Sequence, residues 1–543
     1  MPQTPFETHE VGNQPPPFLP RDLWMDDLAL REAVAREGAD AHAPRLAAYG
    51  ALAGDALQRL GDEANRDRPR LRSHDRFGNR VDQVAFNAAY HEVMGIAIAH
   101  GVASLSWAQP EPGAHVARAA LSYLHYQAEP GSSCPLTMTH AAVPVLRREP
   151  ALRDWADKAM STRYDGRDLP MTDKPGITLG MGMTEKQGGS DVRSNATRAT
   201  PLAVDGEYQL VGHKWFFSAP MSDAFLVLAQ APGGLSCFLL PRWRPDGSKN
   251  ALRLLRLKDK LGDWANASSE VEFEGAWAHR IGEEGRGIAT ILEMVMLTRL
   301  DCMLGSAGLM RIALAQATHH VRHRKAFGKP LIAQPLMRNV LADLALESEA
   351  ATAFAFRVAG AVDRAAQDAR EAAFARIATA IGKYWICKRA AGFVNEAQEC
   401  LGGAGYVEES GLPRLYRQAP LNSIWEGSGN IQCLDVLRAL AREPETRAAL
   451  LAELGSASGV DVDFDAALAQ AEALLAQGVD EAGARALVER LALLLQGATL
   501  LRAGHPLAND YCHSRLEVGR GATYGTLVRG IDGDAAIARI LPD

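Results

Sequence analysis

The residue pattern of this chain changes twice, near residue 178 and near residue 287, and these changes limit what it can fold into. From about residue 23 to 178, Ala- and Leu-rich runs have helical spacing and are separated by prolines and glycines. From residue 179 to 286 the runs are short, with aromatic and β-branched residues, which is typical of strands. Long helical runs then return. The order predicts a helical domain, a β domain and a helical bundle.

Five or six strand-like runs in about 100 residues favour a small barrel or a sandwich. The three long helical runs after residue 287 favour an antiparallel bundle, and a further Ala- and Leu-rich segment follows Arg442. We therefore expect an α+β multidomain chain. Its predicted divisions are 1–178, 179–286, 287–440 and 441–543, and residues 1–22 are proline-rich and predicted to form an extended arm.

Charge and cysteine content exclude some classes of protein. The 58 Lys and Arg residues against 65 Asp and Glu residues argue against wholesale binding to nucleic acid or membrane, but leave room for a local basic patch. Seven scattered cysteines without a CxxC pair indicate neither a disulfide framework nor a zinc site. His319 and His323 have metal-like spacing, but adjacent arginines repel a cation, so we expect no metal. Without a signal peptide or an 18-residue apolar window, we expect a cytoplasmic location.

The glycine-rich run GMGMTEKQGGSD marks a candidate ligand loop. Gly182, Gly188 and Gly189 allow backbone angles that a β-carbon hinders, and Thr184 and Ser190 supply hydroxyl groups. Exposed amides and hydroxyls of this kind suit a phosphate or the edge of a flavin ring. A polar turn that is capped by its own side chains is the alternative.

The run NSIWEGSGNIQ places one carboxylate, Glu426, between an indole and residues that suit a tight turn. One interpretation is a helix N-terminus at which Glu426 complements the helix dipole. The other is a catalytic acid that the turn aims into a site. The segment alone leaves both interpretations open.

Several motifs together resemble the acyl-CoA dehydrogenase family, whose members run from α-helical domain through β-barrel to four-helix bundle. The matching stretches are GMTEKQGGSD, KWFFSAP, RKAFGKPLIAQ, ECLGGAGY and IWEGSG. Over nearly its whole length the chain resembles the AidB branch of that family, in FETHEVGNQPPPF, GSSCPLTMTHAAVPVL, LKDKLG and NSIWEGSGNIQCLDVLRAL. The resemblance implies a flavoprotein that holds FAD.

The resemblance also implies roles for single residues. Thr184 would bond the pyrimidine edge of the flavin and Ser190 the pyrophosphate. Phe216 would lie against the isoalloxazine, with Ser218 directed at its N5; an aromatic core strand is the alternative for this stretch. Further implied FAD contacts are Met181, Gly182, Met183, Gly189, Phe217, Ile424, Trp425, Ser428 and Asn430.

Two motifs are expected to reach the cofactor of a neighbouring subunit. Arg324 would bind its FAD pyrophosphate, Phe327 would border the adenine and ribose, and the amides of Gly402 and Gly403 would also meet it. A solvated helix end is the alternative for the stretch around Arg324.

Glu426 matches the position of the catalytic base in many members of the family. In that role it would remove the proton α to a thioester while a β-hydride leaves for flavin N5. Its amide would donate to the thioester carbonyl. An acyl-CoA is therefore the implied substrate and electron-transferring flavoprotein the implied electron acceptor, with an activity that the AidB resemblance allows to be weak or vestigial.

The AidB resemblance implies a second class of function. It predicts a homotetramer, built as a dimer of dimers, that binds double-stranded DNA through its C-terminal domain and acts in the response to DNA alkylation. From Ala441 to Asp543 there are nine arginines, no lysine and fifteen acidic residues, so this module is net negative. DNA binding would need several arginines to converge on one surface, whereas scattered surface arginines are the alternative. The candidates are Arg485, Arg490, Arg502, Arg515, Arg520 and Arg529.

Overall fold

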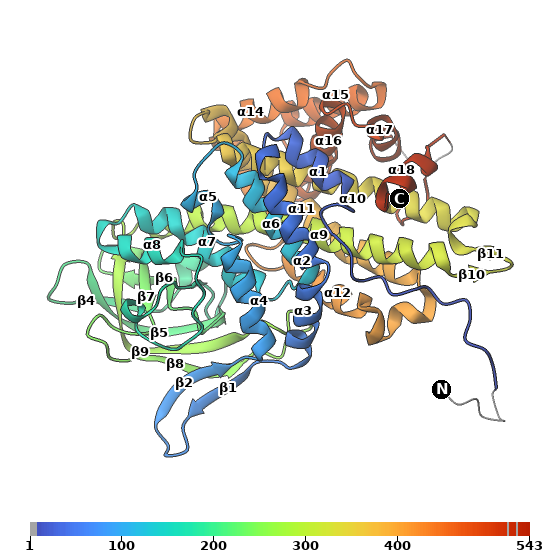
Figure 1. The fold of residues 1–543 in the computed structure, drawn as a ribbon. Helices are drawn as coiled ribbons and strands as arrows, with labels where there is room; N and C mark the ends of the chain where they lie inside the picture. Colours follow the sequence, from blue (N-terminus) through green and yellow to red (C-terminus); the bar gives the residue numbers. More distant parts are fainter. Residues whose placement is uncertain (1–7, 518–520, 528–529, 543) are drawn as a thin grey trace.

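The computed structural model describes residues 8–517, 521–527 and 530–542 of the chain. The N-terminal part is a cluster of helices, and α6 and α7 pack against the long central helix α9 (Gly287–His323) (Figure 1). Its helices are α1 (Leu28–Arg36), α2 (Ala43–Ala53), α3 (Ala56–Arg66), α4 (Ala88–Ala99), α5 (Leu105–Ala108), α6 (Ala114–Ala128), α7 (Ser133–Arg147) and α8 (Arg153–Ala159).

One hairpin, β1 (Arg70–His74) with β2 (Arg80–Ala85), interrupts these helices where the sequence predicted only helix. Its turn is fixed locally, because the Asp75 carboxylate accepts hydrogen bonds from the backbone N–H groups of Phe77 and Asn79. The hairpin projects at the lower edge of the molecule in Figure 1, beside the β domain.

The middle part is one seven-stranded sheet that closes on itself. β6 pairs with β7, β7 with β9, β9 with β5, β5 with β4 and β4 again with β6, while β3 and β8 extend this ring. The strands are β3 (Leu179–Gly182), β4 (Arg198–Pro201), β5 (Glu207–Ser218), β6 (Ala224–Ala231), β7 (Gly234–Pro241), β8 (Leu252–Leu257) and β9 (Ser268–Ile281). Of the two predicted β architectures, the barrel is confirmed.

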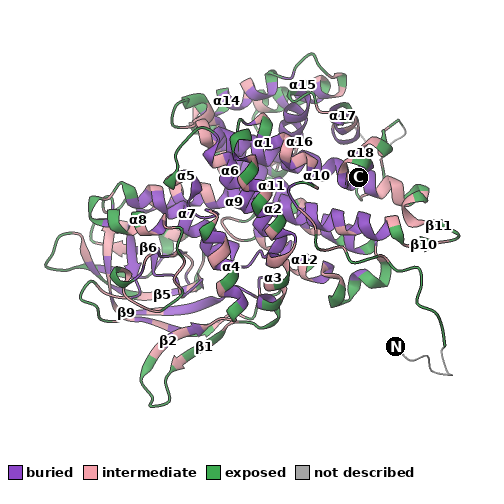
Figure 2. Ribbon diagram, in the orientation of Figure 1, coloured by how far each residue is buried: buried purple, intermediate pink, exposed green. Residues whose placement is uncertain are grey.

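The predicted helical bundle is confirmed by α9, α10 (Pro335–Arg364) and α11 (Ala369–Glu399), which pack on one another, with α12 (Leu412–Gln418) and α13 (Gly429–Arg442) beside them. Every residue of α9 from Thr298 to Ala315 is buried, since neighbouring helices surround it (Figure 2). Among the described residues, no helix is both long and apolar enough to span a bilayer.

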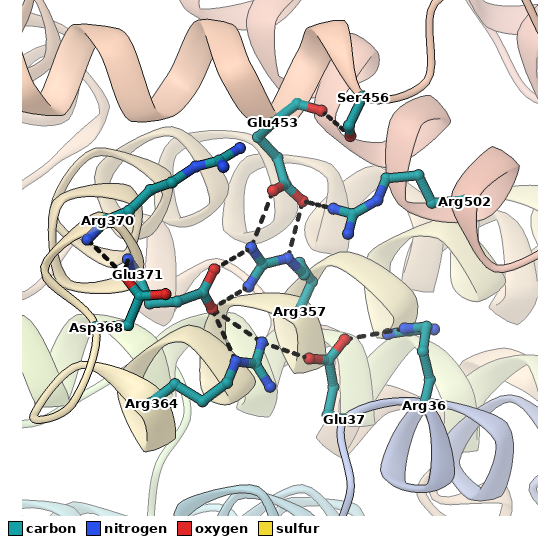
Figure 3. A network of polar contacts seen from close by, with 10 residues as sticks. All are labelled: Arg36, Glu37, Arg357, Arg364, Asp368, Arg370, Glu371, Glu453, Ser456 and Arg502. Atoms are coloured by element: carbon teal, nitrogen blue, oxygen red, sulfur yellow. Dashed lines mark hydrogen bonds and ion pairs between the residues drawn. The ribbon is translucent and has the colours of Figure 1, made fainter.

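The C-terminal helices pack on α10 and α11 at the top of the view in Figure 1. They are α14 (Pro444–Gly455), α15 (Val462–Gln477), α16 (Ala484–Arg502), α17 (Ala508–Leu516) and α18 (Gly533–Ile540). A network of ion pairs joins them to the bundle, because Arg357 on α10 donates both to Glu371 on α11 and to Glu453 on α14 (Figure 3). The domain limits proposed from the sequence stay predictions.

Candidate active site

A cavity of 1120 Å³ lies between the barrel, α7, α9 and the segment before α13. Phe216, Leu261 and Ile424 are exposed at its mouth, whereas Tyr126 and Cys302 are buried at its inner end. Many of the residues predicted as cofactor or catalytic contacts line it. They are Met181, Met183, Thr184, Gly189, Ser190, Phe216, Ser218, Ile424, Trp425, Glu426 and Ser428.

The backbone at Glu426 adopts an uncommon left-handed conformation. Its φ is 58° and that of Gly427 is 92°, so the chain reverses sharply just before α13. A β-carbon on residue 427 would come within 2.7 Å of the Gln432 side-chain nitrogen, which favours glycine there. Two buried cations hold the turn: Lys383 donates to the carbonyls of Trp425 and Gly427, and Arg299 donates to the carbonyl of Glu426 at 3.0 Å.

The Glu426 carboxylate lies on the cavity wall, with the Thr298 hydroxyl donating to its Oε2 at 2.7 Å. Burial raises the pKa of Glu426 above its usual value, while the Thr298 hydrogen bond and the charges of Lys383 and Arg299 oppose that rise. The indole of Trp425 is fixed beside it, since its N–H donates to Asn422 at 2.9 Å. A carboxylate that is partly shielded from water, aimed and hydrogen-bonded in this way can act as a general base.

The barrel side of the cavity fits a flavin nucleotide. The hydroxyls of Thr184, Ser190 and Ser428 face the cavity region without a hydrogen bond to any described side chain or backbone group, so each is available to a ligand. Phe216 is 51% exposed, which offers a flat aromatic face for stacking. Free hydroxyls beside an exposed ring match the donors and the surface that FAD requires.

Comparisons with known proteins identify the family. The model described as Adaptive response protein AidB N-terminal domain matches residues 13–166, and those of the acyl-CoA dehydrogenase middle and C-terminal domains match residues 180–276 and 285–441. AidB of Escherichia coli strain K12 is 50% identical over 521 residues, which cover 95% of this chain and 96% of that protein. The chain belongs to the acyl-CoA dehydrogenase family.

Other relatives agree with this assignment. Acyl-CoA dehydrogenase family member 11 of Caenorhabditis elegans is 32% identical over 435 residues, 76% of this chain and 70% of that protein. The solved structure of C. elegans ACDH-11 in complex with C11-CoA aligns with a TM-score of 0.84 at 27% identity, over 98% of this chain and 93% of that one. Members of the family are FAD flavoproteins, and FAD is accordingly the cofactor of this acyl-CoA dehydrogenase.

Two predicted cofactor contacts of this acyl-CoA dehydrogenase lie elsewhere. The Phe217 side chain is fully buried in the barrel, with its ring 4.1 Å from that of Phe225. Gly182 also faces the Phe217 ring, where a β-carbon would come within 2.5 Å. Alternate residues of a strand point to opposite faces, so Phe216 and Ser218 line the cavity and Phe217 does not. The Phe217 side chain therefore does not line the cavity, and the cofactor contact predicted for this residue stays a prediction.

The residues predicted to reach a neighbouring subunit lie away from the cavity. Arg324, at the end of α9, donates to the carbonyl of Asn13 in the N-terminal arm. Phe327 is 98% exposed at the tip of the hairpin formed by β10 (Lys325–Ala326) and β11 (Lys329–Pro330). Gly402 and Gly403 are exposed in a short 3₁₀ turn. Their contacts with a second subunit's FAD stay predictions.

Asn430 was predicted to bond FAD, yet it is exposed at the start of α13 and does not line the cavity. Its side-chain oxygen instead accepts a hydrogen bond of 2.8 Å from Arg485 on α16. This contact occupies one candidate DNA-binding arginine and ties α16 to the segment that carries Glu426.

The other candidate DNA-binding arginines do not converge among the described residues. Arg515 is buried and ion-paired with Asp343 and Glu347, so its predicted role at a DNA surface is wrong. Arg502 pairs with Glu453 in the network of Figure 3 and lies about 18 Å along α16 from Arg490. Arg490 bonds Gln470. Arg520 and Arg529 lie outside the described residues.

Three residues that contact the Glu426 turn were not predicted: Thr298 and Arg299 on α9, and Lys383 on α11. Each is a polar residue inside a long apolar helix, in LEMVMLTRLDCML or AIGKYWIC. Polar groups in such positions need partners, which is the signal that could have marked them. All three bond the backbone or carboxylate of the Glu426 turn, and Arg299 also pairs with Asp435.

Proposed function

We propose that this acyl-CoA dehydrogenase oxidises a CoA thioester, and that Glu426 removes the α-proton. The observation that carries the proposal is the Glu426 carboxylate, held on the cavity wall by Thr298 at 2.7 Å with its pKa raised by burial. FAD, when bound, supplies the acceptor for the β-hydride. The substrate class is supported by the related ACDH-11 structure, whose title names a complex with C11-CoA.

The residues around Glu426 have separate roles in the proposed proton removal. Thr298 favours the ionised carboxylate, which is the form that accepts a proton. The backbone N–H of Glu426 donates to no described group, so it is available to the thioester carbonyl, whose oxygen gains negative charge as the α-proton leaves. Lys383 and Arg299 keep the turn in the conformation that presents both groups.

Anaerobic titration of the purified flavoprotein with a panel of acyl-CoAs tests the proposal. We expect at least one acyl-CoA to bleach the flavin absorption band, with a matching amount of enoyl-CoA formed. A panel from short straight chains to branched and medium chains that leaves the band unchanged throughout would overturn it.

A tetramer is the second part of the proposal. Phe327, Leu336 and Tyr406 are large apolar side chains that are 98%, 82% and 84% exposed in the single chain, close in sequence to the predicted FAD-contacting residues Arg324 and Gly402. Their exposure in the single chain supports an interface with a second copy, as in a dimer of dimers. Sedimentation of the holoprotein at four times the chain mass is the expected result, and a monomer would contradict it.

Double-stranded DNA binding and a role in the alkylation response are the alternative function. The name of the N-terminal family model, Adaptive response protein AidB, supports it, whereas the partners of Arg502 and Arg515 count against it. Replacing both Arg485 and Arg490 by Ala tests it, since phosphate-dominated binding should weaken and show a shallower salt dependence. If the double variant and the parent protein bind DNA with equal affinity, these arginines do not contact DNA.

The electron acceptor and the location complete the proposal. We infer electron-transferring flavoprotein as the acceptor from family membership. We infer a cytoplasmic location from the seven cysteines, all of which are free and buried.

A further inference from the structure

The inner end of the cavity runs along α9 away from the catalytic carboxylate. Thr298 contacts Glu426, and Cys302 lines the cavity one helical turn later. At the next turn Gly305 has no side chain, and the ring of Tyr126 from α6 lies directly on it. Seven residues of helix separate Thr298 from Gly305, which places the Tyr126 ring about 10 Å from the level of the base. Tyr126 therefore ends the part of the cavity that an acyl chain would enter.

Gly305 is what allows the tyrosine to lie there. A β-carbon on residue 305 would come within 2.5 Å of the Tyr126 ring carbon that bears the hydroxyl. The phenolic end of the ring is therefore pressed against the backbone of α9. The position of the hydroxyl is set by packing, not by a hydrogen bond.

The Tyr126 hydroxyl opens onto the cavity without a partner. The side chain is only 2% exposed and lines the cavity, and no hydrogen bond joins its hydroxyl to any described residue. Burial raises the pKa of Tyr126 well above its usual value, so the group stays protonated and remains a donor. A donor on the cavity wall that no described protein group satisfies is available to a ligand that supplies an acceptor.

The other polar groups at this end of the cavity are already hydrogen-bonded or are only weak hydrogen-bond donors. The Thr137 hydroxyl donates to Asp301 at 2.5 Å. Cys134 and Cys302 are thiols whose pKa burial raises, so they are neutral and only weak donors. Tyr126 is thus the strong donor that remains for a ligand among these described residues.

The charges around this end disfavour an anionic ligand. Arg118 is paired with Asp301, and Lys260 is paired with Asp263, so neither cation is free for a carboxylate. The carboxylates of Asp301 and Asp263 also raise the pKa of the Tyr126 hydroxyl. A terminal carboxylate on the ligand would face these acids without a counter-ion.

We propose that Tyr126 is a specificity-determining residue that selects acyl-CoAs whose acyl chain carries a neutral oxygen, such as a hydroxyl or a keto group, near its distal end. The inference rests on the proposed oxidation of a CoA thioester in this cavity. It adds the class of acyl group: short to medium in length, polar at its end and uncharged.

Matched pairs of acyl-CoAs test this selectivity for a distal neutral oxygen on the FAD-loaded protein. Each pair has the same number of non-hydrogen atoms, with a terminal methyl in one member and a terminal hydroxyl in the other, for example heptanoyl-CoA and 6-hydroxyhexanoyl-CoA. Pairs of several lengths let the hydroxyl reach Tyr126 in at least one of them. Two readouts are measured: the dissociation constant, from the shift of the flavin spectrum on binding, and the limiting rate of flavin reduction.

We expect the hydroxylated member to bind about three- to tenfold more tightly than its partner at one chain length. Tyr126→Phe should remove this preference, so that the two members of the pair bind with equal dissociation constants. The matched control is Tyr511→Phe, which removes a buried hydroxyl on α17 that bonds Gln496 and does not line the cavity. That control should keep the preference.

The outcomes separate this inference from the proposed function. Reduction without any preference between pair members, or a preference that survives Tyr126→Phe, overturns the role of Tyr126 while oxidation stands. A Tyr126-dependent preference in binding without flavin reduction supports Tyr126 and overturns the oxidation. Tighter binding of a dicarboxylic acyl-CoA than of both pair members overturns the neutral-oxygen class, and no binding by any acyl-CoA overturns both proposals.

Discussion

The hydrogen bond from Thr298 to Glu426 should set the pH at which the enzyme works. Thr298→Val keeps nearly the same shape but cannot donate to the carboxylate that Thr298 contacts at 2.7 Å. A hydrogen bond to a charged group contributes about 1.5–3 kcal/mol, and each 1.36 kcal/mol corresponds to one pKa unit. The pKa of Glu426, already raised by burial, should therefore rise by about one to two further units.

The direction of the shift in the pH profile follows from the protonation state of Glu426 that acts as the base. Only the ionised carboxylate accepts the α-proton, so the rate of flavin reduction climbs as pH rises through the pKa of Glu426. In Thr298→Val this climb should move to higher pH by about one to two units, with the plateau rate at high pH retained. Anaerobic stopped-flow reduction by one saturating acyl-CoA, followed across pH, measures the midpoint and the plateau separately.

A matched control is Thr379→Val on α11, where a buried threonine bonds the Ala375 carbonyl at 2.7 Å away from the cavity. Its pH profile should equal that of the parent protein. The reasoning is refuted if the Thr298→Val midpoint does not move, or if its rate falls by the same factor at every pH.

Three further substitutions test the parts that hold the site and the fold. Lys383→Met leaves the Trp425 carbonyl without its side-chain donor and leaves the Gly427 carbonyl with Gln432 alone, so we expect a loss of about 1–3 kcal/mol in unfolding free energy, with weakened FAD retention; an unchanged melting curve would contradict this. Arg324→Ala should lower the ratio of flavin to protein after gel filtration and weaken subunit assembly, whereas full retention would show that this guanidinium does not reach FAD. Arg357→Ala leaves Glu371 with Arg364 alone and Glu453 with Arg502 alone, and should cost about 1–3 kcal/mol in denaturant unfolding; Arg370→Ala, at an exposed arginine of the same region (Figure 3), should cost far less, and equal losses would refute the network's role.

The long helices could be predicted because their signals are local. Apolar periodicity runs through α9, α10 and α11, Pro335 begins α10, and the Asp368 side chain caps α11 by accepting from the N–H groups of Arg370 and Glu371. The hairpin of β1 and β2 escaped prediction because its strands are short and polar. β1 is mostly exposed, and the buried positions of β2 include a charged residue, Asp82, so neither strand shows the apolar alternation of a half-buried strand.

The site was only partly predictable for a different physical reason. The segment NSIWEGSGNIQ contains both the carboxylate of Glu426 and the residues that suit a tight turn, so the two could be predicted together, whereas the left-handed backbone of Glu426 itself could not. Its partners Thr298 and Lys383 come from helices far away in sequence, and only the folded bundle shows that they meet it. The two-residue period of β5 shows that Phe216 and Phe217 face opposite ways, but the sequence alone does not say which one meets the cavity.

Flavin reduction by Glu426→Gln tests the central claim most directly. Glutamine keeps the shape and much of the hydrogen bonding of the glutamate but cannot accept the α-proton, so FAD should stay bound while the rate of reduction by an acyl-CoA falls about 10²- to 10⁴-fold. The same variant should still bind acyl-CoA, as judged by the shift of the flavin spectrum. Reduction at the parental rate, with FAD fully bound, would show that Glu426 is not the base and that the carboxylate in this turn serves only its structure.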